Sequence, residues 1–109
     1  MPASSSRGEH AHRTCHEALL CVRGACKVAL TGLGIKHNLS DNTLSTNFET
    51  REFVLDMPDT ALHIPPMVWC RIYDFTEDCA LLCFASEPFD AQGYIHDIGA
   101  FKAECNSQL

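Results

Sequence analysis

Residues 68–85 read VWCRIYDFTEDCALLCFA, two apolar runs separated by the polar turn Thr76-Glu77-Asp78. Short apolar runs bounded by turn residues are typical of β-strands, and this pattern recurs along the chain. It predicts strands at residues 16–22, 25–31, 51–56, 61–64, 68–75 and 79–85. The sequence therefore belongs to the all-β class.

Only residues 97–104 read as helical, with Ile98, Phe101 and Lys102 at helical spacing and Asp97 as the N-cap. One short helix after a series of strands predicts a barrel or jelly roll with a C-terminal cover.

Two connecting segments carry further predictions. Gly24, in Val22-Arg23-Gly24-Ala25, lies between two apolar runs, which predicts a tight hairpin turn. Residues 32–50 are polar, lack periodicity and are longer than a usual hairpin loop, so we expect a mobile insertion loop there. We expect disorder in residues 1–6.

Composition limits the function classes. A chain of 109 residues predicts a single domain over residues 1–109. The net charge of −6, with eight Lys and Arg, provides no basic stripe and argues against a nucleic-acid partner. The apolar run at residues 79–85 is far shorter than the roughly 20 residues of a membrane helix.

Seven cysteines, without a CxxC pair or an apolar signal core at residues 1–6, predict a cytoplasmic protein with mostly buried, reduced thiols.

The run Arg7-Gly8-Glu9-His10-Ala11-His12 is the strongest chemical signal. In an extended strand, side chains at positions i and i+2 leave the same face, so both imidazoles would enter one pocket. That arrangement suits proton transfer or metal binding. The alternative is a pair of exposed histidines near the N-terminus.

A metal site would combine His10 and His12 with Glu17 and Cys70, ligands acceptable to zinc or iron. Glu17 lies five residues after His12, so on an unbroken strand it points to the opposite face and would need a bulge to join the pocket. Cys70 would also have to face the site. We therefore predict no bound metal.

Several further blocks occur in a defined order, at residues 7–13, 20–24, 64–69, 73–76, 82–90 and 94–95. Together they resemble the WxcM-like cupins, the sugar-nucleotide 3,4-ketoisomerases that act on dTDP-4-keto-6-deoxyglucose. The resemblance implies a cupin-type jelly-roll β-barrel with one short C-terminal helix, a homodimer, and a nucleotide-sugar substrate.

The reaction implied by the resemblance is a tautomerisation without cofactor or metal, serving deoxyamino-sugar or polysaccharide biosynthesis. The carbonyl moves between C4 and C3 of the hexose through an enediol. His10 and His12 match the family's histidine pair. Neutral imidazole accepts a proton near pH 7 and imidazolium returns it, so either histidine suits either step.

Four substrate-binding residues are also expected from this resemblance. Trp69 matches the family's tryptophan and would stack on the thymine or floor the pocket, although a core position is the alternative. The guanidinium of Arg7 would pair with the diphosphate. Arg71 and Tyr73 alternate on one strand face and would meet phosphate or sugar hydroxyls, or face solvent. Tyr94 is expected to tie the helix to the barrel.

The family carries further strands before the position of Arg7, so we expect the chain to be truncated. Two alternatives to an active isomerase therefore stay open. One is a non-catalytic cupin that binds a nucleotide sugar, and the other is a metal-dependent cupin enzyme.

Overall fold

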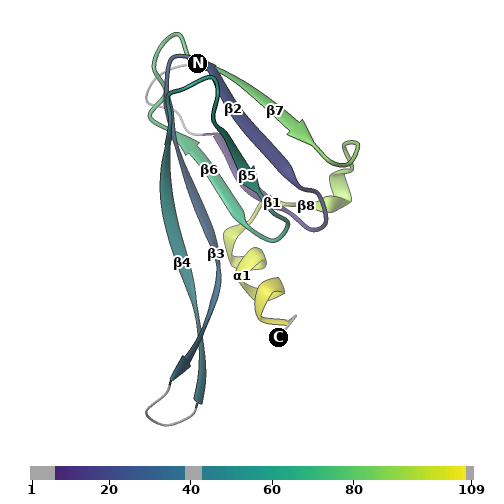
Figure 1. Ribbon diagram of the computed structural model, residues 1–109. Helices are drawn as coiled ribbons and strands as arrows, with labels where there is room; N and C mark the ends of the chain where they lie inside the picture. Colours follow the sequence, from purple (N-terminus) through teal and green to yellow (C-terminus); the bar gives the residue numbers. More distant parts are fainter. Residues whose placement is uncertain (1–6, 39–42, 108–109) are drawn as a thin grey trace.

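The computed structural model describes residues 7–38 and 43–107, with side chains at all of these positions except 7–8, 34–38 and 43–46. The predicted disorder of residues 1–6 lies outside the described residues. Figure 1 shows the elements in chain order, which are β1 (Arg7–His12), β2 (Glu17–Arg23), β3 (Cys26–Asn38), β4 (Thr43–Leu55), β5 (Ala61–Ile64), β6 (Trp69–Tyr73), β7 (Ala80–Ala85), a 3₁₀ helix (Ala91–Gly93), β8 (Tyr94–Ile95) and α1 (Ile98–Ser107).

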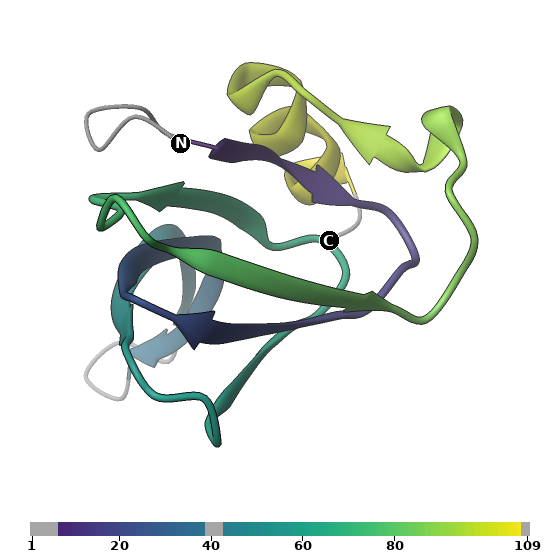
Figure 2. The same ribbon diagram turned by 90° about the horizontal axis from the view of Figure 1, so that it is seen from above.

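The described strands form two antiparallel sheets. One has the strand order β4-β3-β6-β1-β8 and the other has the order β5-β2-β7. Figure 2 shows that α1 lies on the side of β1 facing away from β2 and β7. The all-β class with one short C-terminal helix is confirmed.

Apolar side chains fill the space between the two sheets. Leu19 and Cys21 of β2 pack there against Val28 of β3, Ile72 of β6 and Ile64 of β5, and all five are buried. Burial of this surface is the main favourable contribution to folding. A second buried cluster joins α1 to the five-stranded sheet, and it consists of Ala11, Trp69, Ile95, Phe101 and Cys105.

The start of α1 is capped as predicted. The Oδ2 atom of Asp97 accepts a hydrogen bond from the backbone N–H of Ala100 at 2.9 Å, which satisfies one of the free donors of the first turn. The helix runs to Ser107, three residues beyond the expected end. No helix in the described part of the chain is long and apolar enough to cross a membrane.

The prediction of an insertion loop at residues 32–50 is wrong. Strands β3 and β4 pair continuously from Cys26↔Leu55 to Asn38↔Thr43, so most of this segment is a two-stranded arm. Figure 1 shows the arm reaching beyond the other strands. Backbone hydrogen bonds between the two strands hold such an arm together. Alternation of polar and apolar side chains is needed only where one face of a strand is buried, so the lack of periodicity did not exclude strands here.

The prediction of a tight hairpin at Gly24 is also wrong. Strands β2 and β3, on either side of this residue, belong to different sheets, so the turn carries the chain from one layer to the other. Gly24 adopts a φ of +69°, which is strained for any other residue. A β-carbon there would lie 2.2 Å from Thr76 Oγ1 and 2.6 Å from Asp78 Oδ1.

Replacing Gly24 with alanine should therefore lower the free energy of unfolding by about 2 kcal/mol, because a positive φ and a steric clash act together. The measurement is urea unfolding followed by circular dichroism. Gly93→Ala is the control, since an added β-carbon there meets nothing within 4 Å, and it should change stability by less than about 0.5 kcal/mol. Equal effects of the two substitutions would contradict this account of the turn.

Candidate active site

The two histidines of β1 face the interior between the sheets. His10 pairs with Cys70 of β6, and His12 pairs with Tyr94 of β8. Ala11, between them, is buried on the opposite face beneath α1. His12 is only 6% exposed and His10 is partly buried. Residues 7–12 are extended, as expected for two histidines at positions i and i+2, and the two imidazoles lie on the same face of β1.

Glu17 joins these histidines without the bulge that the sequence analysis required. The chain leaves the five-stranded sheet after His12 and enters the three-stranded sheet at Glu17, so the two residues do not share a strand. Glu17 Oε1 lies 2.6 Å from His12 Nε2 and 3.6 Å from His10 Nε2. The two Nε2 atoms are 3.1 Å apart. A carboxylate and two imidazoles thus meet across the gap between the layers.

The Glu17 carboxylate is held in its ionised form. The neighbouring His10 ring is the largest cause that lowers its pKa, burial opposes the lowering, and the Cys83 hydrogen bond and the charges of His12 and His10 add to it, giving a pKa of about 2. The Cys83 thiol donates to Glu17 Oε2 at 2.7 Å. Burial, followed by this hydrogen bond, raises the pKa of Cys83 to about 12, so the thiol stays a donor.

Tyr94 completes the wall beside the histidines. Its ring centroid lies 4.3 Å from that of His12 and 5.3 Å from that of His10. Burial raises the pKa of Tyr94, so the residue stays a neutral phenol. The antiparallel register of β1 with β8 places His12 and Tyr94 opposite each other on the inner face.

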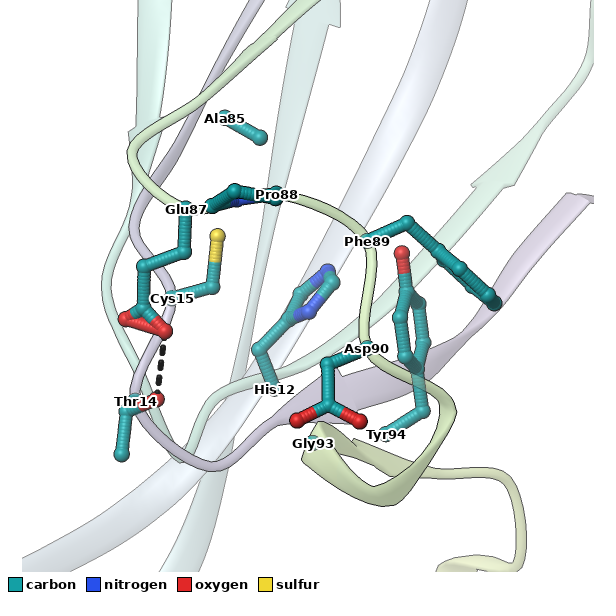
Figure 3. Close-up of a pocket in the computed structure, with 10 residues that line it drawn as sticks. All are labelled: His12, Thr14, Cys15, Ala85, Glu87, Pro88, Phe89, Asp90, Gly93 and Tyr94. Carbon is teal, nitrogen blue, oxygen red and sulfur yellow. Dashed lines mark hydrogen bonds between the residues drawn. The ribbon is translucent and has the colours of Figure 1, made fainter.

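A cavity of about 140 Å³ opens beside His12. Figure 3 shows Tyr94 and Phe89 on one side of His12 and Cys15 on the other. The hydroxyl of Thr14 donates to Glu87 Oε1 at 2.7 Å. The remaining lining residues are Ala85, Pro88, Asp90 and Gly93. The cavity offers hydroxyl, carboxylate and backbone groups next to an imidazole.

This arrangement can hold and move protons. The Nε2 atoms of His10 and His12 and Oε1 of Glu17 lie within 3.6 Å of one another. A proton taken up at either Nε2 therefore lies beside an ionised carboxylate, which stabilises the imidazolium. The cluster of His10, His12 and Glu17 can therefore accept a proton and return it.

The proposed metal ligand Cys70 is not part of this cluster. Cys70 packs in the core between the sheets, and burial is the main cause that raises its pKa to about 12. The close group of metal-binding atoms at this place comprises His10, His12 and Glu17, all within 4.8 Å of one another.

The predicted substrate-binding residues of β6 lie elsewhere. Trp69 is buried in the cluster beneath α1, with its ring 5.8 Å from that of Phe101, which matches the core alternative. Arg71 lies over the Tyr73 ring at 4.7 Å and forms an ion pair with Glu9. Residues paired across two strands have their side chains on the same face of the sheet. Cys70 pairs with His10, which faces inward, so Trp69, Arg71 and Tyr73 of β6 lie on the outer face. They are not brought together with the histidines.

The Tyr73 hydroxyl donates to Glu52 of β4 at 2.6 Å. Arg7 belongs to β1, but its side chain lies outside the described residues.

Sequence reasoning did not place three residues of the site correctly. Glu17 was considered only as a metal ligand that needed a bulge, because the parity argument assumed one continuous strand. Tyr94 was expected to serve only as a tie to the helix, and Cys83 was expected to be one of the buried thiols. One signal was available in the sequence. Glu17, Leu19 and Cys21 occupy alternate positions of β2, which belongs to a different sheet from β1. Because Leu19 and Cys21 are core residues, Glu17 on the same face must also point into the interior.

Comparison with known proteins finds two relatives, one of them in two crystal structures. The oxoisomerase acting on TDP-4-oxo-6-deoxy-α-D-glucose from Aneurinibacillus thermoaerophilus is 32% identical over 96 residues, covering 88% of this chain. The chain spans 59% of the length of that relative. The crystal structure of QdtA, a sugar 3,4-ketoisomerase from Thermoanaerobacterium thermosaccharolyticum in complex with TDP, matches with a TM-score of 0.80 at 30% identity. That match covers 100% of this chain and 69% of QdtA.

A histidine-to-asparagine mutant of QdtA in complex with TDP-4-keto-6-deoxyglucose also matches, with a TM-score of 0.80, 29% identity and the same coverage of both chains. The family model described as FdtA, WxcM-like, C-terminal matches residues 1–106. The chain therefore belongs to the FdtA family of WxcM-like C-terminal domains.

Proposed function

We propose that this chain is a sugar-nucleotide 3,4-ketoisomerase that converts the 4-keto form of a dTDP-6-deoxyhexose into the 3-keto form. The observation that carries the proposal is the contact of His10, His12 and Glu17, in which His12 also lines the adjoining cavity. The relatives named as TDP-sugar oxo- and ketoisomerases support the substrate class. The product would serve deoxyamino-sugar or polysaccharide biosynthesis.

The reaction moves one hydrogen from C3 to C4 and one from the C3 oxygen to the C4 oxygen. Removal of the C3 hydrogen, with protonation of the C4 carbonyl oxygen, creates an enediol across C3 and C4. Delivery of a proton to C4, with loss of the C3 hydroxyl proton, creates the new C3 carbonyl. We assign these steps to His10 and His12 as a pair. Their Nε2 atoms are 3.1 Å apart, so a proton can pass between them without crossing water.

Glu17 is proposed as a positioning residue for this pair. Its Oε1 atom holds the imidazoles and its Oε2 atom accepts the Cys83 thiol hydrogen bond, so the carboxylate has a fixed orientation. An ionised carboxylate next to His12 stabilises the imidazolium that forms when the C3 proton is removed. Tyr94 packs against both rings and limits their rotation.

The hexose would enter the cavity beside His12, where Thr14, Glu87 and Asp90 supply polar partners for hydroxyl groups. Arg7 remains the proposed partner of the diphosphate. We leave Trp69, Arg71 and Tyr73 out of the proposed pocket, because they lie on the outer face of the five-stranded sheet.

A metal-dependent cupin enzyme is the second candidate. Two imidazole nitrogens and one carboxylate oxygen within 4.8 Å form a ligand set known from catalytic zinc sites. A bound ion would polarise the sugar carbonyl as a Lewis acid. Loss of activity with a chelator, together with one equivalent of metal in the purified protein, would favour this candidate over the metal-free reaction.

The homodimer and the cytoplasmic location stay predictions. Light scattering of the purified chain would decide the first, and fractionation of the source cells would decide the second.

Replacing either His10 or His12 with asparagine should reduce turnover of dTDP-4-keto-6-deoxyglucose by about 10²–10⁴-fold, because a general acid–base group is lost. The assay is incubation in deuterated water, with deuterium at C3 and C4 and the 3-keto product followed by NMR. His63→Asn is the matched control. His63 is an exposed histidine on β5, 2.9 Å from His16, and its replacement should leave the rate unchanged.

The same assay separates the alternatives. Substrate binding without deuterium exchange in the unmodified chain would point to a non-catalytic cupin that binds a nucleotide sugar. Full activity in both histidine variants would rule out the proposed proton path.

Glu17→Gln should lower the free energy of unfolding at neutral pH by up to about 3 kcal/mol, the equivalent of the lowered pKa. Because the folded-state pKa of about 2 lies below the ordinary glutamate value of 4.5, this contribution is present above pH 4.5 and disappears as the pH falls towards 2. Denaturant unfolding of both proteins between pH 2 and 7 measures it. Glu77→Gln, at an exposed loop position, is the control. A stability difference independent of pH would contradict the ionised-carboxylate model.

A further inference from the structure

Three cysteines meet at the turn where β2 passes into β3, on residues that the proposed reaction does not use. The sulfur atoms of Cys21, Cys26 and Cys79 all lie within 4.8 Å of one another, and those of Cys21 and Cys79 are 4.0 Å apart. They come from the end of β2, the start of β3 and the residue before β7. No CxxC motif marks this cluster, because the fold assembles it from separate segments.

The cluster is fixed by backbone hydrogen bonds. Gly24 turns the chain so that Cys21 and Cys26, on either side of it, both point inward, and each is only 1% exposed. Thr76, in the turn between β6 and β7, binds Ala25, the residue before β3. Its N–H donates to Ala25 O at 2.9 Å and its hydroxyl accepts from Ala25 N at 3.0 Å. The N–H of Cys79 then donates to Thr76 O at 3.1 Å. The third thiol is held against the other two before any ligand arrives.

The spacing of the sulfurs fits one soft metal ion. A closed-shell ion such as zinc bonds thiolate sulfur at about 2.3 Å, so three sulfurs in a plane around it lie about 4.0 Å apart. Zinc prefers four ligands, whereas the group of close ligand atoms among the described residues contains three, all sulfur. Soft thiolate ligands select Cu(I), which accepts three of them.

Access and charge agree with an ion site. Cys79 is partly exposed and opens the cluster towards solvent, whereas the other two thiols are buried. The carboxylate of Asp78 lies next to Cys79 and supplies negative charge that favours a cation. Burial, followed by the proximity of Cys79 and Cys21, raises the pKa of Cys26 to about 12, so a bound ion has to displace thiol protons.

We propose that Cys21, Cys26 and Cys79 form a three-thiolate site for a thiophilic monovalent ion, Cu(I). The site is separate from the His10, His12 and Glu17 cluster, and it does not depend on the proposed isomerase activity. Each bound Cu(I) would form three copper–sulfur bonds and release the three thiol protons, without any change in the oxidation state of sulfur or copper.

The test is a titration of the reduced 109-residue chain with Cu(I) under argon. Thiolate-to-copper charge-transfer absorption reports metal bound by sulfur, and its loss in Cys79→Ser assigns that metal to this cluster rather than to Cys83 beside Glu17. Native mass spectrometry gives the number of ions bound. We expect one Cu(I) per chain, and binding at least about 100-fold weaker in Cys79→Ser, because one of three direct ligands is lost.

Cys79 is the primary variant because it is partly exposed, whereas replacing buried Cys21 risks unfolding the chain. Circular dichroism checks the fold of Cys79→Ser, and Cys79→Ala is the second variant. Cys105→Ser is the matched control: this thiol is buried beneath α1 in the other apolar cluster, and its loss should leave Cu(I) binding unchanged.

Three results would overturn the proposal. The first is the absence of a 1:1 copper complex in the unmodified chain. The second is undiminished binding in folded Cys79→Ser. The third is a disulfide between two of these cysteines in the chain as purified, seen as a mass two hydrogens lower, because the thiols would then be unavailable to copper.

Discussion

The contact between Glu17 and His12 is the constraint on which the rest of the site depends. It joins the two sheets, because His12 ends a strand of one and Glu17 begins a strand of the other. β1 lies between β6 and β8, and β2 lies between β5 and β7, so each partner stands on a strand with neighbours on both sides. A separation of 2.6 Å between a carboxylate and an imidazole is therefore maintained by two complete layers of backbone pairing.

Local patterns were sufficient for much of the fold. The short apolar runs identified strands such as residues 61–64, and the Asp97 cap located the start of the helix. The arm formed by β3 and β4 could not be found in this way, since it is held by backbone pairing and its outer part reaches beyond the other strands (Figure 1), where no alternation is needed. The turn at Gly24 was recognised, but whether a turn joins neighbouring strands or separate sheets depends on contacts far apart in the sequence.

The site was predictable to the extent that it depends on a single strand. Positions i and i+2 share a face, and this placed His10 and His12 together. Glu17 and Tyr94 reach them through strand order and register, which a local pattern does not contain. The same limit explains why Trp69 was expected in the pocket. The alternation of residues along β6 was visible in the sequence, but only the pairing of His10 with Cys70 shows which face of β6 lies inside.

The strand order also determines when the site can form. Among the described strands β1 comes first in the chain, yet its two partners, β6 and β8, come much later, and β8 follows all the other described strands. Contacts between such distant segments carry a large loop-closure cost and form slowly. The histidines therefore stay without their final neighbours until the segment that carries β8 has left the ribosome, and a stop in translation that removes β8 also removes Tyr94 from the wall of the cavity.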